Sequence, residues 1–165
     1  WTITFVDTGL HSNIGQRLLR ARRYVESEPM FLANYADGLS DVPLDQLIEL
    51  VERRNAIAGF ASVRSAQSFH VVRAAADGVV SGISAMNQGE LWMNGGYFVL
   101  RPEIFAHINE GDELVEKPFA RLIEKQRLVT YQHHGFWQAM DTLKDKINYD
   151  RMEAQGKCPW MLWRK

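Results

Sequence analysis

The chain has 165 residues, of which 46% are hydrophobic and 24% charged, and its formal net charge is −1. This composition is typical of a folded globular protein, and it lacks the basic character of proteins that attract nucleic acid or membranes through charge. No apolar run reaches the roughly 20 residues that cross a bilayer. The single Cys158 excludes an internal disulfide framework and suits a reducing compartment. We therefore expect one cytoplasmic domain over residues 1–165, without nucleic-acid or membrane partners.

Apolar periodicity and turn residues predict strands that alternate with helices. The expected strands are 2–6, 31–35, 56–63, 69–74, 79–83, 91–100 and 128–133, and the expected helices are 17–26, 44–51, 102–108, 113–126 and 143–153. Asp77-Gly78 predicts a tight hairpin turn, and Asp41 is expected to cap the helix after Pro43. The alternation predicts an α/β fold with a mixed, mostly parallel sheet and helices on its faces. Because the chain opens as if inside a strand, we expect it to belong to a larger protein.

Two acidic segments carry the strongest chemical signal. Asp37, in the segment 35–42, follows one apolar run, and Asp141, in the segment 135–142, follows another. Ligands of α/β proteins bind at strand ends, and two neighbouring carboxylates can share a Mg²⁺ that also holds substrate phosphates. The pair therefore predicts a magnesium site for phosphoryl or nucleotidyl transfer. Alone, each Asp also suits a structural role, in an Asp-Gly turn or beside a helix cap.

Three weaker signals lie elsewhere in the chain. Gly15 and Arg17 fall near the start of a predicted helix, where an anion is favoured, although an ordinary loop would look the same. Asn94-Gly95-Gly96 interrupts a predicted strand, which indicates either a bulge or the close approach of a ligand such as a sugar. His133 and His134 are adjacent in a strand and point to opposite faces, which disfavours zinc binding.

Together these segments resemble the sugar-phosphate nucleotidyltransferase family. The similar stretches, in the family's order, are VDTG at 6–9, GQRL at 15–18, YADGLSDV at 35–42, NGGYFVL at 94–100, GFWQAMDTLKDK at 135–146 and GKCPW at 156–160. The resemblance implies a Rossmann-like fold of which this chain lacks the N-terminal part. It also implies the joining of a nucleoside triphosphate to a sugar 1-phosphate with the help of Mg²⁺. Within the family, the likeness is greatest to members that use CTP and glucose 1-phosphate.

By position, the resemblance implies a role for each of six residues. Asp37 and Asp141 match the metal ligands. Gly15 and Arg17, together with Asp37, match the nucleotide-binding segments. Asn94 and Gly95 match the segment that touches the sugar. No protein nucleophile is implied, because such chemistry relies on positioning and electrostatics. Exposed sheet edges lead us to expect a homo-oligomer.

The chain departs from the family pattern at the segments that, in the family, neutralise the charge of the substrate phosphates. The family's Gly-rich loop and its lysine have no counterpart here. The family's Arg-Phe-Gly is replaced by Ser68-Phe69-His70, and its Glu-Lys-Pro by residues 83–87, which contain no Lys or Glu. Each missing charge-assisted hydrogen bond to phosphate is worth about 1.5–3 kcal/mol. The alternative hypothesis is therefore a degenerate homologue without catalytic activity, acting as a nucleotide-binding, sugar-binding or assembly module.

Overall fold

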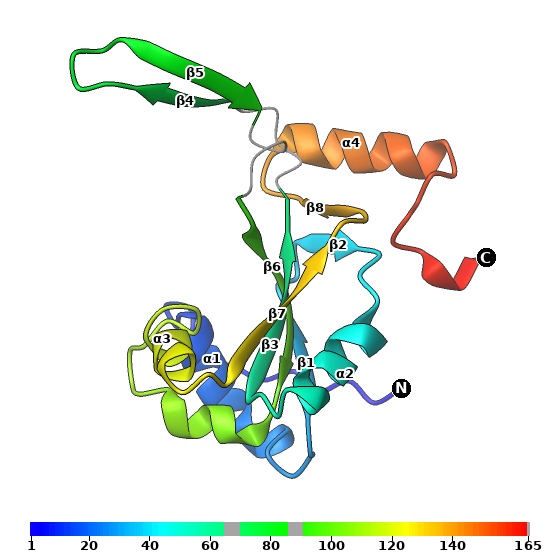
Figure 1. Cartoon of the computed structure of the whole chain (residues 1–165). Coiled ribbons are helices and arrows are strands. Elements are labelled where there is room, and N and C mark those ends of the chain that lie inside the picture. Colours follow the sequence, from blue (N-terminus) through cyan, green and yellow to red (C-terminus); the bar gives the residue numbers. More distant parts are fainter. Residues whose placement is uncertain (65–69, 86–90, 165) are drawn as a thin grey trace. The chain divides into compact units, whose positions relative to one another are not determined.

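A computed structural model describes residues 1–64, 70–85 and 91–164 of the chain. Within these ranges, three 3-10 helices cover Arg22–Tyr24, Pro102–His107 and Leu162–Arg164. The other elements, labelled in Figure 1, are α1 (Ile14–Ala21), β1 (Phe31–Asn34), β2 (Gly38–Ser40), α2 (Leu44–Arg53), β3 (Ala58–Val63), β4 (His70–Ala74), β5 (Val80–Ala85), β6 (Met93–Leu100), α3 (Lys117–Glu124), β7 (Leu128–His133), β8 (Trp137–Ala139) and α4 (Leu143–Ala154). None of the helices in these ranges has both the length and the hydropathy of a membrane-crossing segment.

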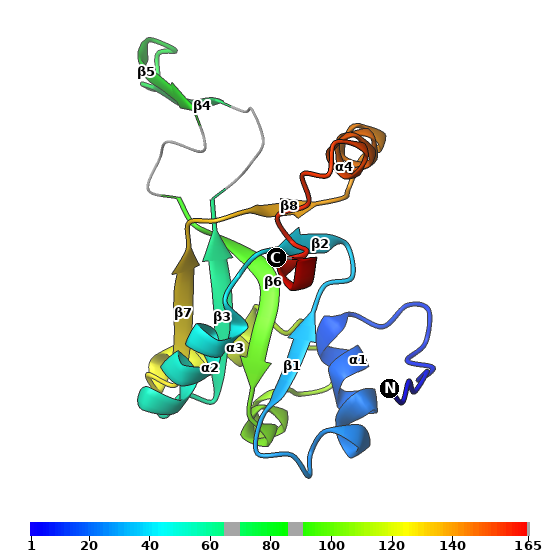
Figure 2. The same cartoon turned by 90° about the vertical axis from the view of Figure 1, so that its right-hand side faces the viewer.

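The largest sheet is mixed, with the strand order β1-β6-β3-β7. The amide of Ile57 donates to the carbonyl of Arg127 at 2.8 Å and joins the starts of β3 and β7, so these two strands run parallel. The amide of Arg101 donates to the carbonyl of Ile57 at 2.9 Å and joins the end of β6 to the start of β3. The arrow of β6 accordingly points opposite to those of β3 and β7 in Figure 2. The predicted mixed α/β architecture is therefore confirmed.

The chain, predicted as a single domain, gathers into two compact units. The first unit comprises Trp1–Ala33, Leu44–Phe60 and Tyr97–Tyr131, and the second comprises Asn34–Pro43, Ala61–Gly96 and Gln132–Lys165. Each unit is therefore described by itself below.

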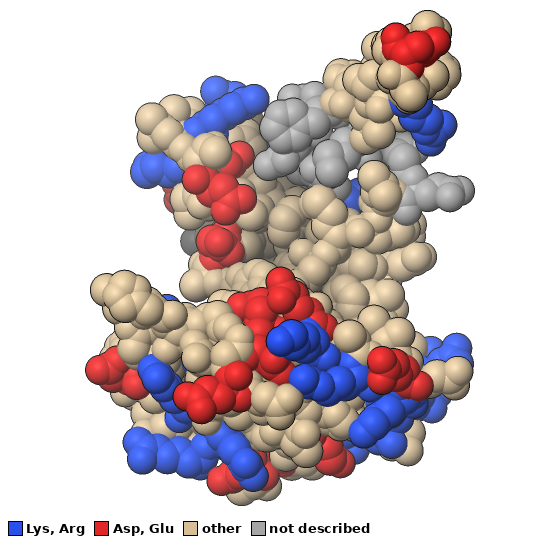
Figure 3. Space-filling model, turned by 90° about the vertical axis from the view of Figure 1, so that its left-hand side faces the viewer, with Lys and Arg blue, Asp and Glu red and all other residues tan. Residues whose placement is uncertain are grey.

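The first unit has helices on both faces of its sheet strands. Leu47 and Val51 of α2 are fully buried and pack against Val99 of β6. Phe119 of α3 meets the preceding residue of β6, Phe98, with ring centroids 6.1 Å apart. Successive side chains of a strand point to opposite faces, so α2 and α3 cover opposite sides. On the face drawn in Figure 3, acidic and basic side chains are interspersed.

The second unit contains two small antiparallel pairs and α4. In the β4–β5 hairpin, Gly78 has a φ of +88° and the Asp77 carboxylate accepts from the Val79 amide at 3.1 Å, as the Asp-Gly signal predicts. Tyr149 of α4 is buried and packs against Trp160, with ring centroids 5.2 Å apart.

Several sequence predictions of local structure are wrong. Residues 1–9 form neither helix nor strand, and Trp1, Ile3 and Phe5 are exposed. A strand needs a neighbour for its backbone groups, and the structure pairs no described strand with this segment. The predicted helix at 102–108 is a 3-10 helix.

Helix starts follow local capping more closely than apolar periodicity. The first helix was predicted from residue 17 but begins at Ile14, because Asn13 and Gln16 form a capping box. The helix predicted over 113–126 is limited to Lys117–Glu124, with Pro118 in its first turn.

Candidate functional site

The two acidic segments, about one hundred residues apart in sequence, form a pair of short antiparallel strands. In this pair of β2 with β8, Gly38 lies opposite Ala139, Leu39 opposite Gln138, and Ser40 opposite Trp137. The sequence analysis did not predict either strand. The structure therefore brings together the two segments that carry Asp37 and Asp141, as the resemblance implies.

Asp37 and Asp141 lie at the same end of this strand pair. Asp37 directly precedes β2, and Asp141 comes two residues after β8. The amide of Met140 donates to the carbonyl of Asp37 at 2.8 Å, which continues the ladder by one step. Both aspartates are exposed. Within the described ranges, neither carboxylate takes part in a hydrogen bond or ion pair, so both are available to a ligand.

These two carboxylates fit the donor set that Mg²⁺ uses in phosphate-binding sites. Mg²⁺ prefers oxygen ligands and is commonly held by one or two carboxylates, with waters and substrate phosphates completing its shell. Among residues 1–64, 70–85 and 91–164, no group of three or more His, Cys, Asp and Glu side chains is arranged to hold a metal ion.

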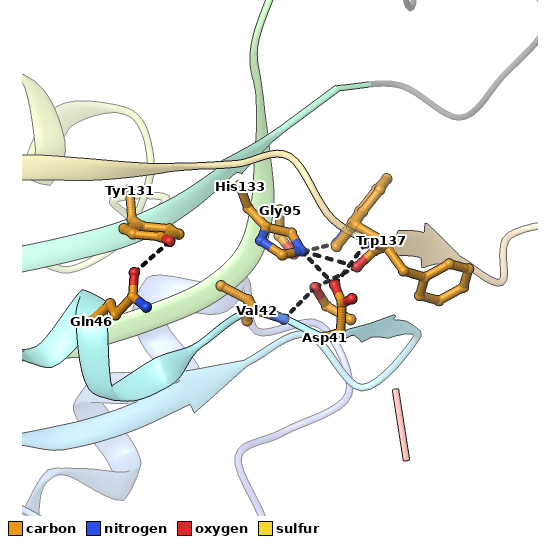
Figure 4. Close-up of polar contacts among 9 residues, drawn as sticks. Asp41, Val42, Gln46, Gly95, Tyr131, His133 and Trp137 are labelled. Carbon is orange, nitrogen blue, oxygen red and sulfur yellow. Dashed lines mark hydrogen bonds and ion pairs between the residues drawn. The ribbon is translucent and has the colours of Figure 1, made fainter. Parts of the chain in front are cut away.

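A partly buried pair, Asp41 and His133, lies at the other end of the strand pair (Figure 4). The Asp41 carboxylate accepts from the Phe136 amide at 2.7 Å and lies 2.7 Å from Nε2 of His133. His133 is 7% exposed and Asp41 is 30% exposed at the side chain. The prediction that Asp41 caps α2 is wrong, because α2 begins three residues later, at Leu44, and the Asp41 carboxylate accepts from the Phe136 amide instead.

Backbone and hydroxyl groups extend this network. The carbonyl of Phe136 accepts from Oγ of Ser40 at 2.8 Å and from the Asp41 amide at 3.2 Å. A Cβ atom at Gly135 would lie 2.6 Å from Cε1 of His133, which is closer than carbon atoms approach without repulsion. Glycine at position 135 therefore allows the segment to close on the ion pair.

The Asn94-Gly95-Gly96 segment has structural partners of its own. Nδ2 of Asn94 donates to the hydroxyl of Tyr35 at 3.3 Å, and its Oδ1 accepts from the Gly96 amide at 2.9 Å. The carbonyl of Gly95 accepts from Nε1 of Trp137 at 2.8 Å, as Figure 4 shows. Gly96 has a φ of +73°, which favours glycine. The strand β6 runs through this segment, so the predicted interruption is absent.

Gly15 and Arg17 lie in the first compact unit, whereas the other four predicted site residues lie in the second. Gly15 is buried, and a Cβ atom there would collide with the carbonyl oxygen of Asp112. The guanidinium of Arg17 donates to Oγ1 of Thr8 at 2.8 Å and to the carbonyl of Leu10 at 3.3 Å. Both residues therefore have structural roles that need no nucleotide.

The N-terminus of α1, expected to attract an anion, is occupied by side chains of the chain itself. Asn13 and Gln16 each accept from the other's backbone amide, at 2.9 and 3.1 Å. The Glu113 carboxylate accepts from the amide of Ile14 at 3.2 Å and supplies the negative charge that a helix N-terminus favours.

A cavity of about 530 Å³ adjoins α4 in the second unit. Its lining includes Gln138 of β8, the apolar Leu143 and Ile147, and the cationic Lys144 and Arg151. The sequence analysis did not predict this cavity. The spacing of its α4 residues, which places them on one face of the helix, could have indicated it. The replacements noted at 68–69 and 86–87 lie outside the described residues.

Comparisons with known proteins support the resemblance. Two curated relatives carry the name glucose-1-phosphate cytidylyltransferase, from Salmonella typhimurium (strain LT2) and Salmonella typhi. Each is 33% identical over 99% of this chain. A Bacillus subtilis (strain 168) protein assigned to the same activity is 32% identical over 99% of the chain. The chain spans 64% of the length of each relative. No protein-family model matches the chain.

Solved structures share the fold at low sequence identity. A Bacillus anthracis structure in complex with a sucrose, assigned as a glucose-1-phosphate thymidylyltransferase, has a TM-score of 0.60 at 12% identity and is aligned over 90% of this chain and 63% of its own. The structure of HddC from Yersinia pseudotuberculosis has a TM-score of 0.57 at 14% identity, over 87% of this chain and 62% of its own. The resemblance to sugar-phosphate nucleotidyltransferases and the Rossmann-like fold are thus confirmed, and the chain covers part of that fold.

Proposed function

We propose that this chain forms part of a sugar-phosphate nucleotidyltransferase that converts CTP and glucose 1-phosphate into CDP-glucose and pyrophosphate in the cytoplasm. The observation that carries the proposal is the pairing of β2 with β8, which places Asp37 and Asp141 at one end of a strand pair. Their carboxylates are exposed and have no hydrogen bond or ion pair within the described part of the chain. The names of the curated relatives support this choice of nucleotide and sugar.

In the proposed reaction, a phosphate oxygen of glucose 1-phosphate attacks the α-phosphorus of CTP in line. The new P–O bond forms as the bond to the β-phosphate oxygen breaks, and pyrophosphate leaves. Mg²⁺ would neutralise charge on the phosphates when bound. The chain's own part is to hold the reactants, and such positioning can supply much of the rate of phosphoryl-type transfer.

Each predicted site residue has a place in this scheme. Asp37 and Asp141 would hold the Mg²⁺–nucleotide complex. The exposed part of Asn94, beside Gly95, would offer a donor and an acceptor to the sugar. Gly15 and Arg17 would lie near the nucleotide base, as their position in the family pattern implies. Lys144 and Arg151 of α4 add positive charge three and ten residues after Asp141.

Isothermal titration of the chain with CTP tests the proposal, with and without Mg²⁺ and with UTP and dTTP for comparison. We expect Mg²⁺-dependent binding that prefers CTP. Asp37→Asn and Asp141→Asn should each weaken it roughly tenfold or more, as expected for one lost charged contact. The matched control is Asp45→Asn, which removes an exposed carboxylate from the first turn of α2.

Two outcomes contradict the proposal. Failure of the wild-type chain to bind any triphosphate would favour the degenerate homologue without catalytic activity. Binding that is unaffected by both site variants would place the nucleotide elsewhere in the molecule.

A further inference from the structure

Three side chains meet where β3 and β7 end and β6 begins. Arg64 directly follows β3, His134 directly follows β7, and Trp92 directly precedes β6. These strands are consecutive in the sheet order β6-β3-β7. The cluster therefore occupies the carboxyl ends of two parallel strands, which is where open α/β sheets bind ligands.

The cluster is held together by contacts between rings and a cation. The guanidinium carbon of Arg64 lies 5.1 Å from the centroid of the Trp92 ring. The His134 ring lies 5.1 Å from the same ring system, centroid to centroid, at an interplanar angle of 90°. Arg64 and His134 are exposed, and Trp92 is half-buried. The cationic group is therefore oriented and still open to solvent.

Arg64 differs from Arg17 and Arg121 in how its charge is used. Arg17 donates to protein oxygens, and Arg121 forms an ion pair with Asp112 at 2.6 Å. Within residues 1–64, 70–85 and 91–164, Arg64 has no hydrogen bond or ion pair, only the contact with the Trp92 ring. Its positive charge is thus available to an anion.

The guanidinium of Arg64 lies over the Trp92 ring, and a planar guanidinium presents its N–H groups in pairs. Such an oriented fork matches two oxygens of one phosphate and forms paired, charge-assisted hydrogen bonds. The contact with Trp92 also restricts the Arg64 side chain before a ligand binds, so that binding costs less conformational entropy. The geometry therefore favours a phosphate group over a monovalent halide or a neutral ligand.

The cluster is also close to the segment assigned to the sugar. Trp92 lies two residues before Asn94 on the chain that leads into β6, so the two residues are at most about 7 Å apart along the backbone. A hexose phosphate whose sugar contacts Asn94 would carry its phosphate toward Arg64.

We propose that Arg64, positioned by Trp92 and His134, binds the phosphate of the sugar 1-phosphate. The choice of the sugar 1-phosphate as ligand rests on the proposed function. The contacts themselves require only that the ligand carry a phosphate group. Arg64 is the binding residue, and Trp92 and His134 are positioning residues.

Titration of the ¹⁵N-labelled full chain, followed by NMR, tests this inference. The readouts are the indole N–H of Trp92 and the backbone amides of Arg64 and His134. The probes are glucose 1-phosphate, inorganic phosphate, glucose and Mg²⁺-free CTP. Arg64→Gln removes the charge, and Arg73→Gln in β4 is the matched control, because Arg73 is also an exposed strand arginine.

We expect saturable shifts of the cluster with glucose 1-phosphate, weaker ones with inorganic phosphate, and none with glucose. Arg64→Gln should weaken glucose 1-phosphate binding roughly tenfold or more, and Arg73→Gln should leave it unchanged. Equal affinities in wild type and Arg64→Gln, or shifts confined to other residues, would overturn the inference. Tighter binding of CTP than of glucose 1-phosphate at the cluster would overturn the choice of the sugar phosphate.

This titration contains no Mg²⁺ and does not depend on Asp37 or Asp141. A failure of the Mg²⁺–CTP site would therefore leave its result interpretable, and the failure of each proposal can be recognised separately.

Discussion

At the scale of single residues, the pair of Asp41 and His133 joins the residue that follows β2 to the last residue of β7. Its nitrogen and oxygen lie 2.7 Å apart, and the same carboxylate accepts from the Phe136 amide. Asp41→Asn removes the charge but keeps an acceptor for that amide. We expect a loss of about 1–3 kcal/mol in the free energy of unfolding, with the lower part of the range favoured because Asp41 is partly exposed.

Urea unfolding of wild type and variant measures this loss, and Asp45→Asn serves as the control for removing an exposed carboxylate. An unchanged urea midpoint for Asp41→Asn would show that the ion pair does not stabilise the fold.

A second residue-scale prediction concerns acid stability. The hydrogen bond from Arg121 lowers the pKa of Asp112, and the Asn109 amide acts in the same direction. The carboxyl therefore releases its proton more readily in the folded than in the unfolded chain. Its contribution to stability is fully present above the unfolded pKa of about 3.9 and is lost as the pH falls through the lower folded pKa.

Asp112→Asn should remove this part of the pH dependence and lower stability near neutral pH. Thermal unfolding of wild type and Asp112→Asn from pH 3 to pH 7 measures both effects. Parallel stability curves for variant and wild type below about pH 4 would contradict the assignment.

At the scale of elements, the capping box of α4 lies beside the candidate site. Thr142 accepts from the Asp145 amide at 3.2 Å, and the Asp145 carboxylate accepts from the Thr142 amide at 3.0 Å. Thr142→Ala should cost about 1 kcal/mol of stability, and Thr142→Ser should restore most of it. Chemical denaturation of the two variants measures the difference, and equal destabilisation by both would argue against the cap.

Strong periodicity made several elements predictable from sequence. The stripe of Leu44, Leu47, Ile48 and Val51 predicted α2, and apolar runs predicted β3, β6 and β7. The strands β2 and β8 were missed because each has three residues and owes its existence to a partner about one hundred residues away. The predicted strand at 2–6 failed for the opposite reason, since β propensity without a partner does not make a strand.

The sequence predicted some residues of the candidate site, missed others and misassigned one. The segments of Asp37 and Asp141 were found because acidic residues after apolar runs are a local signal. The cluster of Arg64, Trp92 and His134 was missed, because its members are far apart in sequence and meet only through the order of three strands. Asp41 was misassigned, because its carboxylate accepts from the Phe136 amide, 95 residues away in the sequence, and no local pattern reveals that partner.

At the scale of the whole molecule, exposed apolar residues and sheet edges lead us to predict self-association. Leu32 is 52% exposed on β1, an outer strand of the four-stranded sheet. Unpaired edges of this kind promote pairing between chains. Sedimentation velocity should show a weight-average mass that rises with concentration above that of the monomer.

Leu32→Lys should reduce this rise, because a charged side chain on an outer strand disfavours edge pairing. Ile123→Lys is the matched control, since Ile123 is 63% exposed but lies on α3. Monomeric behaviour at all concentrations, or an equal effect of both variants, would contradict the role of the sheet edge.

The central claim is that Asp37 and Asp141 together hold one divalent cation with the nucleotide. The most direct test is NMR of the full chain with CTP and Mn²⁺, a paramagnetic ion that accepts the same carboxylate ligands as Mg²⁺. We predict that the amides of Gly38 and Ala139, which lie opposite each other in the strand pair, broaden first. Asp37→Asn and Asp141→Asn should each abolish this broadening. Broadening that begins elsewhere, or that survives either substitution, would contradict the claim.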